Sequence, residues 1–103
     1  MPVAQLAGNT DEGSRTFVID GEGHTLGNAL RTIIVCYPDV EFCGYTVPHP
    51  AENKINFRIQ MMTGKGKAID ALKRGLSDLA TVCDVMLQKF DNDLESYKEH
   101  YKV

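Results

Sequence analysis

A periodic line of apolar residues over the last third of the chain constrains its fold more than any other feature. From residue 68 onward, apolar and aromatic residues recur at steps of three or four, and no proline interrupts them. The mean step is close to the 3.5-residue repeat of helices that pack along one another. The pattern predicts one long helix from residue 68 to near the end of the chain. Its apolar stripe comprises Ile69, Leu72, Leu76, Leu79, Cys83, Met86, Phe90, Leu94, Tyr97 and Tyr101.

This helix is too long for a domain of this size to cover. About 35 residues at about 1.5 Å each span roughly 50 Å, whereas a domain of 103 residues is only about 35 Å across. The helix is therefore expected to overhang its own sheet. Because an uncovered apolar stripe is unfavourable, we expect another chain to cover residues 76–94. The alternative is that the charged last turns, beyond Ser96, fray in solvent.

Three segments have the composition of β-strands, at residues 14–20, 40–47 and 53–62. In the last segment Ile55, Phe57, Ile59 and Met61 alternate with polar residues, which indicates a sheet with one buried and one solvated face. Prolines at 48 and 50 favour a longer loop over a two-residue hairpin.

A shorter helix is expected between the first two strands, over residues 25–37. Leu26, Leu30, Ile33 and Ile34 recur there at helical spacing, and Pro38 ends the segment. The predicted order is β-α-β-β-α, a two-layer α+β fold with a long C-terminal helix. Residues 1–14 are expected to be a flexible tail, and residues 15–103 a single domain.

Composition excludes several classes of function. The net charge is -3, which disfavours direct binding of nucleic acid, since that depends on clustered Lys and Arg. The three cysteines show no close pairing and predict a reduced, intracellular protein rather than a disulfide framework. Neither a membrane-spanning stretch nor a signal peptide is expected. An RNA-recognition fold would need a fourth strand after the last helix and more aromatic residues on its central strand.

Motifs that could carry chemistry are incomplete. Gly21, Gly23 and Gly27 have the wrong spacing for a dinucleotide fingerprint, and the loop at 63–67 lacks the full phosphate-loop pattern. Metal sites need three or four converging ligands. Neither candidate set meets that need, and we predict no catalytic residue, metal or cofactor. The candidate sets are Asp20, Glu22 and His24, and Cys36, Cys43 and His49.

Three stretches together resemble the alpha-like subunits of eukaryotic RNA polymerases. Residues 24–31 (HTLGNALR) are similar to a signature of that family, and residues 38–50 (PDVEFCGYTVPHP) resemble a second block. Residues 54–60 (KINFRIQ) look like the strand that follows it. The resemblance covers roughly residues 15–95. Within the family the chain looks most like the small subunits shared by polymerases I and III, with the polymerase II counterpart as the alternative.

The resemblance implies a fold like the dimerisation domain of the bacterial alpha subunit. It also implies a heterodimer with a larger alpha-like subunit, docking of the second-largest and other core subunits, and a location in the nucleus, including the nucleolus. Such a subunit scaffolds the catalytic subunits that make ribosomal RNA, 5S RNA and tRNA, and it binds no nucleic acid, membrane or small molecule itself. The residues expected at the partner interface are Leu26, Gly27, Leu30, Ile33, Ile34, Leu72, Leu76, Leu79, Cys83, Met86 and Phe90. A stand-alone small enzyme and an RNA-binding module are the competing classes.

Overall fold

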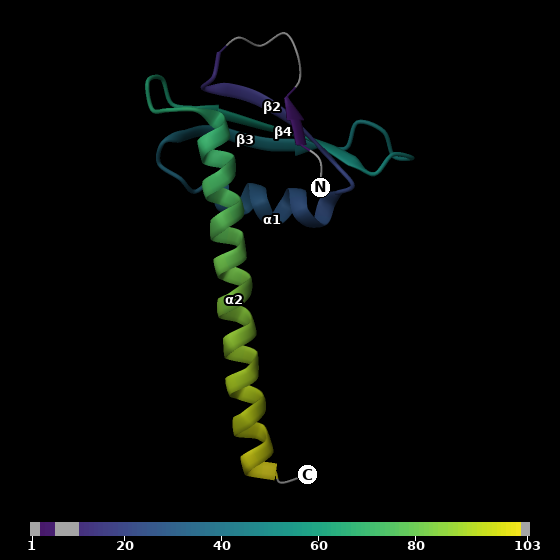
Figure 1. Ribbon diagram of the computed structural model, residues 1–103, viewed down its shortest axis with the longest axis vertical. Helices are drawn as coiled ribbons and strands as arrows, with labels where there is room; N and C mark the ends of the chain where they lie inside the picture. The colour runs from purple at the N-terminus through teal and green to yellow at the C-terminus, as the bar shows by residue number, and fades with distance from the viewer. Residues whose placement is uncertain (1–2, 6–10, 102–103) are drawn as a thin grey trace.

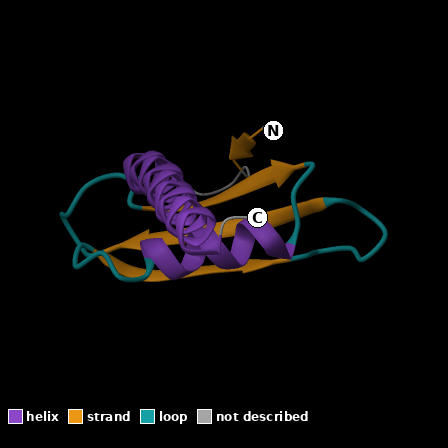
Figure 2. Ribbon diagram, turned by 90° about the horizontal axis from the view of Figure 1, so that it is seen from below, coloured by secondary structure: helices purple, strands orange, loops and turns teal. Residues whose placement is uncertain are grey.

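One four-stranded antiparallel sheet and two helices make up the protein, in a computed structural model that describes residues 3–5 and 11–101. The strands occur in the order β1-β2-β4-β3 across the sheet. Both helices lie on the same side of the sheet (Figures 1 and 2). The two-layer α+β prediction is therefore confirmed. The elements are β1 (Val3–Gln5), β2 (Ser14–Asp20), α1 (His24–Ile34), β3 (Val40–Thr46), β4 (Lys54–Met61) and α2 (Ala68–Tyr101).

The alternation along β4 separates the two faces of the sheet, as the sequence predicts. Ile55, Phe57, Ile59 and Met61 are buried, and the residues between them are only half-buried. The neighbouring strand β2 continues the same buried face, because its Phe17 lies opposite Phe57 in the antiparallel register. These side chains form the core on which both helices pack.

The first helix covers this core with Leu30 and Ile34, which are fully buried. It begins at His24, one residue before the predicted start, and ends at Ile34, three residues before the predicted end. Residues 35–37 continue as a hydrogen-bonded turn, in which the Tyr37 N–H donates to the Ile34 carbonyl. The early end follows from Pro38, since a residue before proline is disfavoured in the helical conformation.

The expected flexible tail contains a strand. Val3–Gln5 forms β1, which pairs with β2 through the register Val3↔Ile19. The free edge of β2 provides a physical reason, because its unpaired backbone groups can bind another strand. Further along, the Gly13 carbonyl accepts from the Met61 N–H and the Glu12 carbonyl from the Ala68 N–H. The rest of the predicted tail, residues 1–2 and 6–10, lies outside the described residues. The order is therefore β-β-α-β-β-α.

The second helix overhangs the domain, as predicted from its length. The molecule measures 61 × 36 × 17 Å, and α2 runs along the longest dimension (Figure 1). Leu76 and Leu79 are half-buried, and every described residue from Ala80 onward is exposed. The helix continues to Tyr101, beyond Ser96, where fraying is the alternative. We call residues 80–101 the arm.

The two helices approach most closely at Gly75. A Cβ atom built on Gly75 would lie 2.5 Å from Cγ1 of Ile34 and 3.2 Å from Cδ1 of Leu30. Both side chains are fully buried in the core, so they have little room to move aside. Gly75 therefore allows α2 to cross α1 at close range while both helices cover the same sheet.

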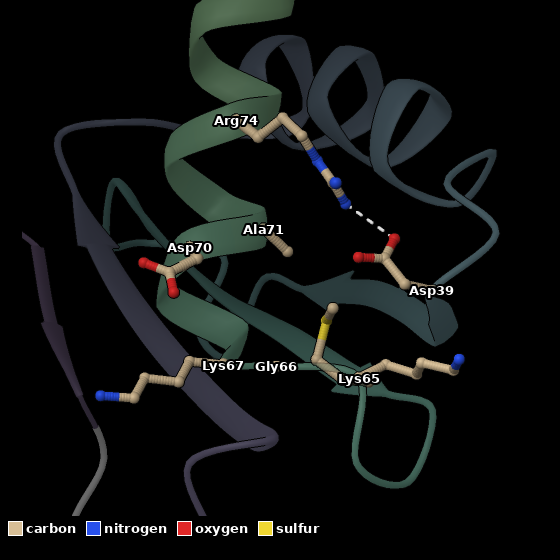
Figure 3. A pocket seen from close by; sticks show the side chains of 8 residues that line it. Asp39, Lys65, Gly66, Lys67, Asp70, Ala71 and Arg74 are labelled. Atoms are coloured by element: carbon tan, nitrogen blue, oxygen red, sulfur yellow. Dashed lines mark hydrogen bonds and ion pairs between the residues drawn. The ribbon is translucent and has the colours of Figure 1, made fainter.

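A polar cluster fixes the direction in which α2 leaves the domain. The Tyr37 hydroxyl donates to Asp78, and the Arg74 guanidinium lies 3.9 Å from the centroid of the Tyr37 ring. Arg74 also reaches Asp39, with 2.8 Å between Nη2 and Oδ1 (Figure 3). The hydrogen bond from Arg74 holds the pKa of the Asp39 carboxyl below its ordinary value. Asp78, which helical spacing alone places on a solvated face of α2, is thus engaged with the domain.

We expect Gly75→Ala to destabilise the protein despite the better helix propensity of alanine. Removing glycine from a helix interior gains about 1 kcal/mol, whereas overpacking a filled core costs about 1–3 kcal/mol. Thermal unfolding followed by circular dichroism measures the net change in stability from these two effects. Ser77→Ala, at an exposed position two residues along, is the control and should be neutral or mildly stabilising. A Gly75→Ala protein more stable than wild type would contradict this view of the crossing.

Alkaline pH should expose the role of Tyr37. Burial, followed by its hydrogen bond to Asp78, raises the pKa of Tyr37 from 10.0 to about 12. Between these two values the unfolded chain releases the phenolic proton while the folded chain keeps it, so stability is lost as pH rises from 10 towards 12. The free energy of unfolding should therefore fall more steeply in this window for wild type than for Tyr37→Phe. Equal slopes would show that Tyr37 does not couple folding to pH.

Candidate interaction surface

The arm presents an uncovered row of large apolar side chains. Met86 is 65% exposed and Phe90 62% exposed, although both lie on the stripe that begins in the core. A monomeric protein rarely leaves a continuous apolar surface of this kind in water. The arm is therefore the candidate site for binding another chain. The exposed apolar and aromatic residues on it are Val82, Val85, Met86, Leu87, Phe90, Leu94, Tyr97 and Tyr101.

The structure divides the predicted interface residues into three groups by burial. Gly27, Leu30, Ile34 and Leu72 are buried within the chain itself, so they offer no surface for a partner. Their apolar spacing arises from packing on the sheet, which spacing alone does not distinguish from packing on a partner. A second group is half-buried where the helices emerge from the domain, and a third is exposed on the arm. The second group is Leu26, Ile33, Leu76 and Leu79, and the third is Cys83, Met86 and Phe90.

Gly27 leaves room for an aromatic ring of the neighbouring strand. A Cβ atom there would lie 2.8 Å from Cδ2 of the Tyr45 ring, so the close neighbour is a side chain of β3. The same ring is held by His24, whose Nδ1 is 2.9 Å from the Tyr45 hydroxyl oxygen. His24, Gly27 and Tyr45 thus join the first turns of α1 to β3.

Three apolar residues of the arm do not belong to the predicted stripe. Val82 lies four residues before Met86, Leu87 directly follows it, and Val85 precedes it. At about 100° per residue, Val82 and Leu87 lie on opposite sides of the line through Leu79 and Met86. The signal in the sequence is the local density of apolar residues between 82 and 87, which widens the stripe. The arm therefore offers a broad apolar surface in its first third, close to the domain.

The motifs that could carry chemistry do not converge in the structure. The Lys65 and Lys67 side chains point in opposite directions (Figure 3), and Lys67 Nζ pairs with Glu12 at 3.3 Å. Cys43 is buried in the core, where burial raises the pKa of its thiol to about 12. Over residues 3–5 and 11–101, no three His, Cys, Asp or Glu side chains lie close enough to hold a metal ion. No helix among these residues is long and apolar enough to cross a membrane.

Relatives at high identity are subunits of RNA polymerases I and III. The Drosophila melanogaster protein "DNA-directed RNA polymerases I and III subunit RPAC2" is 55% identical, over 92% of this chain and 90% of that protein. The Saccharomyces cerevisiae protein of the same name is 52% identical, over 87% of this chain and 63% of that protein. A Caenorhabditis briggsae protein assigned as polymerase II subunit RPB11 is 37% identical, over 77% of this chain and 64% of that protein.

A solved structure and a family model agree with these relatives. DNA-directed RNA polymerase subunit L of Thermoplasma acidophilum has the same fold, with a TM-score of 0.76 at 17% identity and full coverage of both chains. The model of the RNA polymerase Rpb3/Rpb11 dimerisation domain matches residues 14–89. That range includes the whole sheet from β2 onward, α1 and the first part of the arm. The chain therefore belongs to the RNA polymerase Rpb3/Rpb11 dimerisation domain family.

Proposed function

We propose that this chain is the non-catalytic small alpha-like subunit of DNA-directed RNA polymerases I and III. It forms a heterodimer with the larger alpha-like subunit, and the pair scaffolds the second-largest and other core subunits for synthesis of ribosomal RNA, 5S RNA and tRNA. The observation that carries the proposal is the uncovered apolar arm in a chain of a dimerisation-domain family. The subunit works in the nucleus, including the nucleolus.

The form of the arm supports pairing with a helix of the partner. Its stripe keeps a repeat close to 3.5 residues, which is the spacing at which two helices stay in contact over several turns. Phe90 and Met86 are the large exposed side chains at the middle of this surface, and buried aromatic anchors dominate the free energy of many interfaces. Leu79 and Leu76, which are half-buried at the root of the arm, continue the same surface towards the domain.

A scaffolding role also fits the charges on this chain. Phosphoryl transfer by metal ions needs carboxylates that converge on the metals, and Asp91 and Asp93 are two apart on a helix, so they point in different directions. The net charge of -3 opposes direct binding to a nucleic-acid backbone. The chain thus contributes the position of other subunits rather than chemistry.

Assignment to polymerases I and III rather than II rests on the relatives. Four proteins of polymerases I and III are 50–55% identical to this chain, whereas the polymerase II protein is 37% identical. The pattern of helices and strands expected for the family does not separate the two subunit types, so the assignment depends on sequence identity.

A tagged copy of the chain should co-purify with the catalytic subunits of both polymerase I and polymerase III. Mass spectrometry of the purified complexes identifies the largest subunits, which differ between the three polymerases. Recovery of the largest subunit of polymerase II in place of the other two would overturn the assignment. Recovery of no polymerase subunit would overturn the scaffold function itself.

We expect Phe90→Asp to abolish recovery of the larger alpha-like subunit in a pull-down. The side chain is 62% exposed in the free chain, so the change leaves the fold intact, but it places a charge in the apolar interface. Gln88→Asp adds the same charge about 180° away from the stripe and is the matched control. Leu79→Asp, at the half-buried root, should also abolish recovery, although it disturbs the domain as well. Wild-type recovery with Phe90→Asp would exclude the arm as the interface.

A further inference from the structure

The tip of the arm carries a polar and aromatic hollow that interrupts its apolar surface. The Tyr97 and Tyr101 rings lie side by side, with 4.7 Å between their centroids and 34° between their planes. Both rings are largely exposed, at 53% and 66%. A carboxylate, two phenol rings, an imidazole and a hydroxyl thus face one shallow space. The residues that line it are Asp93, Ser96, Tyr97, His100 and Tyr101.

Asp93 occupies a position in the stripe where an apolar residue is expected. It follows Leu79 and Met86 at intervals of seven residues, so the three side chains lie on nearly the same line of the helix. Phe90 and Tyr97, three residues before and four after Asp93, lie on either side of it along this line. A helix that packs against Met86 and Phe90 therefore also covers the Asp93 carboxylate.

The Asp93 carboxylate has no ion-pair partner in the part of the chain that the structure describes. Over residues 3–5 and 11–101, neither an ion pair nor a hydrogen bond engages Asp93. Covering an unpaired carboxylate with apolar groups is strongly unfavourable, whereas covering it with a cation is not. A cation on the covering chain would satisfy the carboxylate at this point, next to Lys89, which lies one turn before Asp93 on the same side of the helix.

The charge of the arm narrows the choice of covering chain. With five carboxylates and two lysines, the arm has a net charge of -3 when histidine is neutral. A second copy of this chain would bring another acidic arm, and in a parallel pair it would place Asp93 against Asp93. The charged residues are Asp84, Lys89, Asp91, Asp93, Glu95, Lys98 and Glu99.

We propose that the hollow binds an arginine or lysine side chain from the facing helix of the larger alpha-like subunit, which deepens the function proposed above and rests on it. The cation pairs with the Asp93 carboxylate, and one ring of the stacked Tyr97 and Tyr101 pair contacts it through its outer face, where an aromatic ring attracts a positive charge. A single polar residue in an apolar helix interface fixes register and partner at some expense of stability. Asp93 thereby selects a basic partner and disfavours self-pairing.

The test compares variants of Asp93 in the purified heterodimer. Asp93→Asn should weaken binding of the larger subunit about tenfold or more, as expected when one member of a covered charge pair is removed. Asp93→Leu should weaken it as well, because the partner's cation then faces a leucine. Asp91→Asn, on the opposite side of the helix, is the matched control and should bind like wild type. Raising the salt concentration should narrow the difference between wild type and Asp93→Asn.

A second measurement distinguishes selective binding of the larger subunit from nonspecific self-association of this chain. Sedimentation of the chain alone should show stronger self-association for Asp93→Leu than for wild type. If Asp93→Leu binds the larger subunit as well as wild type or better, the proposal is overturned, because Asp93 would then make no contact with the partner. Failure of the wild-type chain to bind the larger subunit at all would instead overturn the proposed function.

Discussion

The close crossing of α1 and α2 at Gly75 is the contact on which the arrangement depends. Because no side chain stands between the helices there, Ile34 and Leu30 pack directly against α2, and both helices reach the same face of a narrow sheet. Only the first turns of α2 are buried on the sheet, and the helix then runs away from the sheet along the longest dimension of the molecule (Figures 1 and 2). The Tyr37, Arg74 and Asp78 contacts hold α2 where it leaves the domain.

Features that repeat along the chain could be predicted from the sequence. The alternation in β4 and the three-or-four-residue spacing in α2 each report a local geometry, and both appear as predicted. Features that depend on a contact between distant segments could not be predicted. The pairing of Val3–Gln5 with β2, the Tyr45 ring against Gly27 and the hydrogen bond from Tyr37 to Asp78 all join residues that no periodicity relates.

The candidate interface shows the same limit within one helix. A single apolar stripe runs through α2, and its spacing is uniform from Leu72 to Phe90. The structure assigns Leu72 to the core of the chain itself and leaves Phe90 exposed, with the change near Leu79. Spacing predicts that a face is buried but does not identify what buries it. The direction in which α2 leaves the sheet decides that question, and it is a property of the folded domain (Figure 1).

In the proposed function, the arm must bind its partner and must not bind a second copy of itself. Different residues along the arm serve these two requirements. In this function, binding is strengthened by broad apolar surface, and the arm supplies it in its first third, where Val82 and Leu87 flank Met86. The same surface would bind a second copy of the chain equally well, because apolar contact does not distinguish partners. Asp93 places a charge on the line of Leu79 and Met86, and on our proposal a cation of the other chain pairs with it when the arm is covered. The proposed interface, mostly apolar, would thus gain its selectivity from one carboxylate towards the tip of the arm.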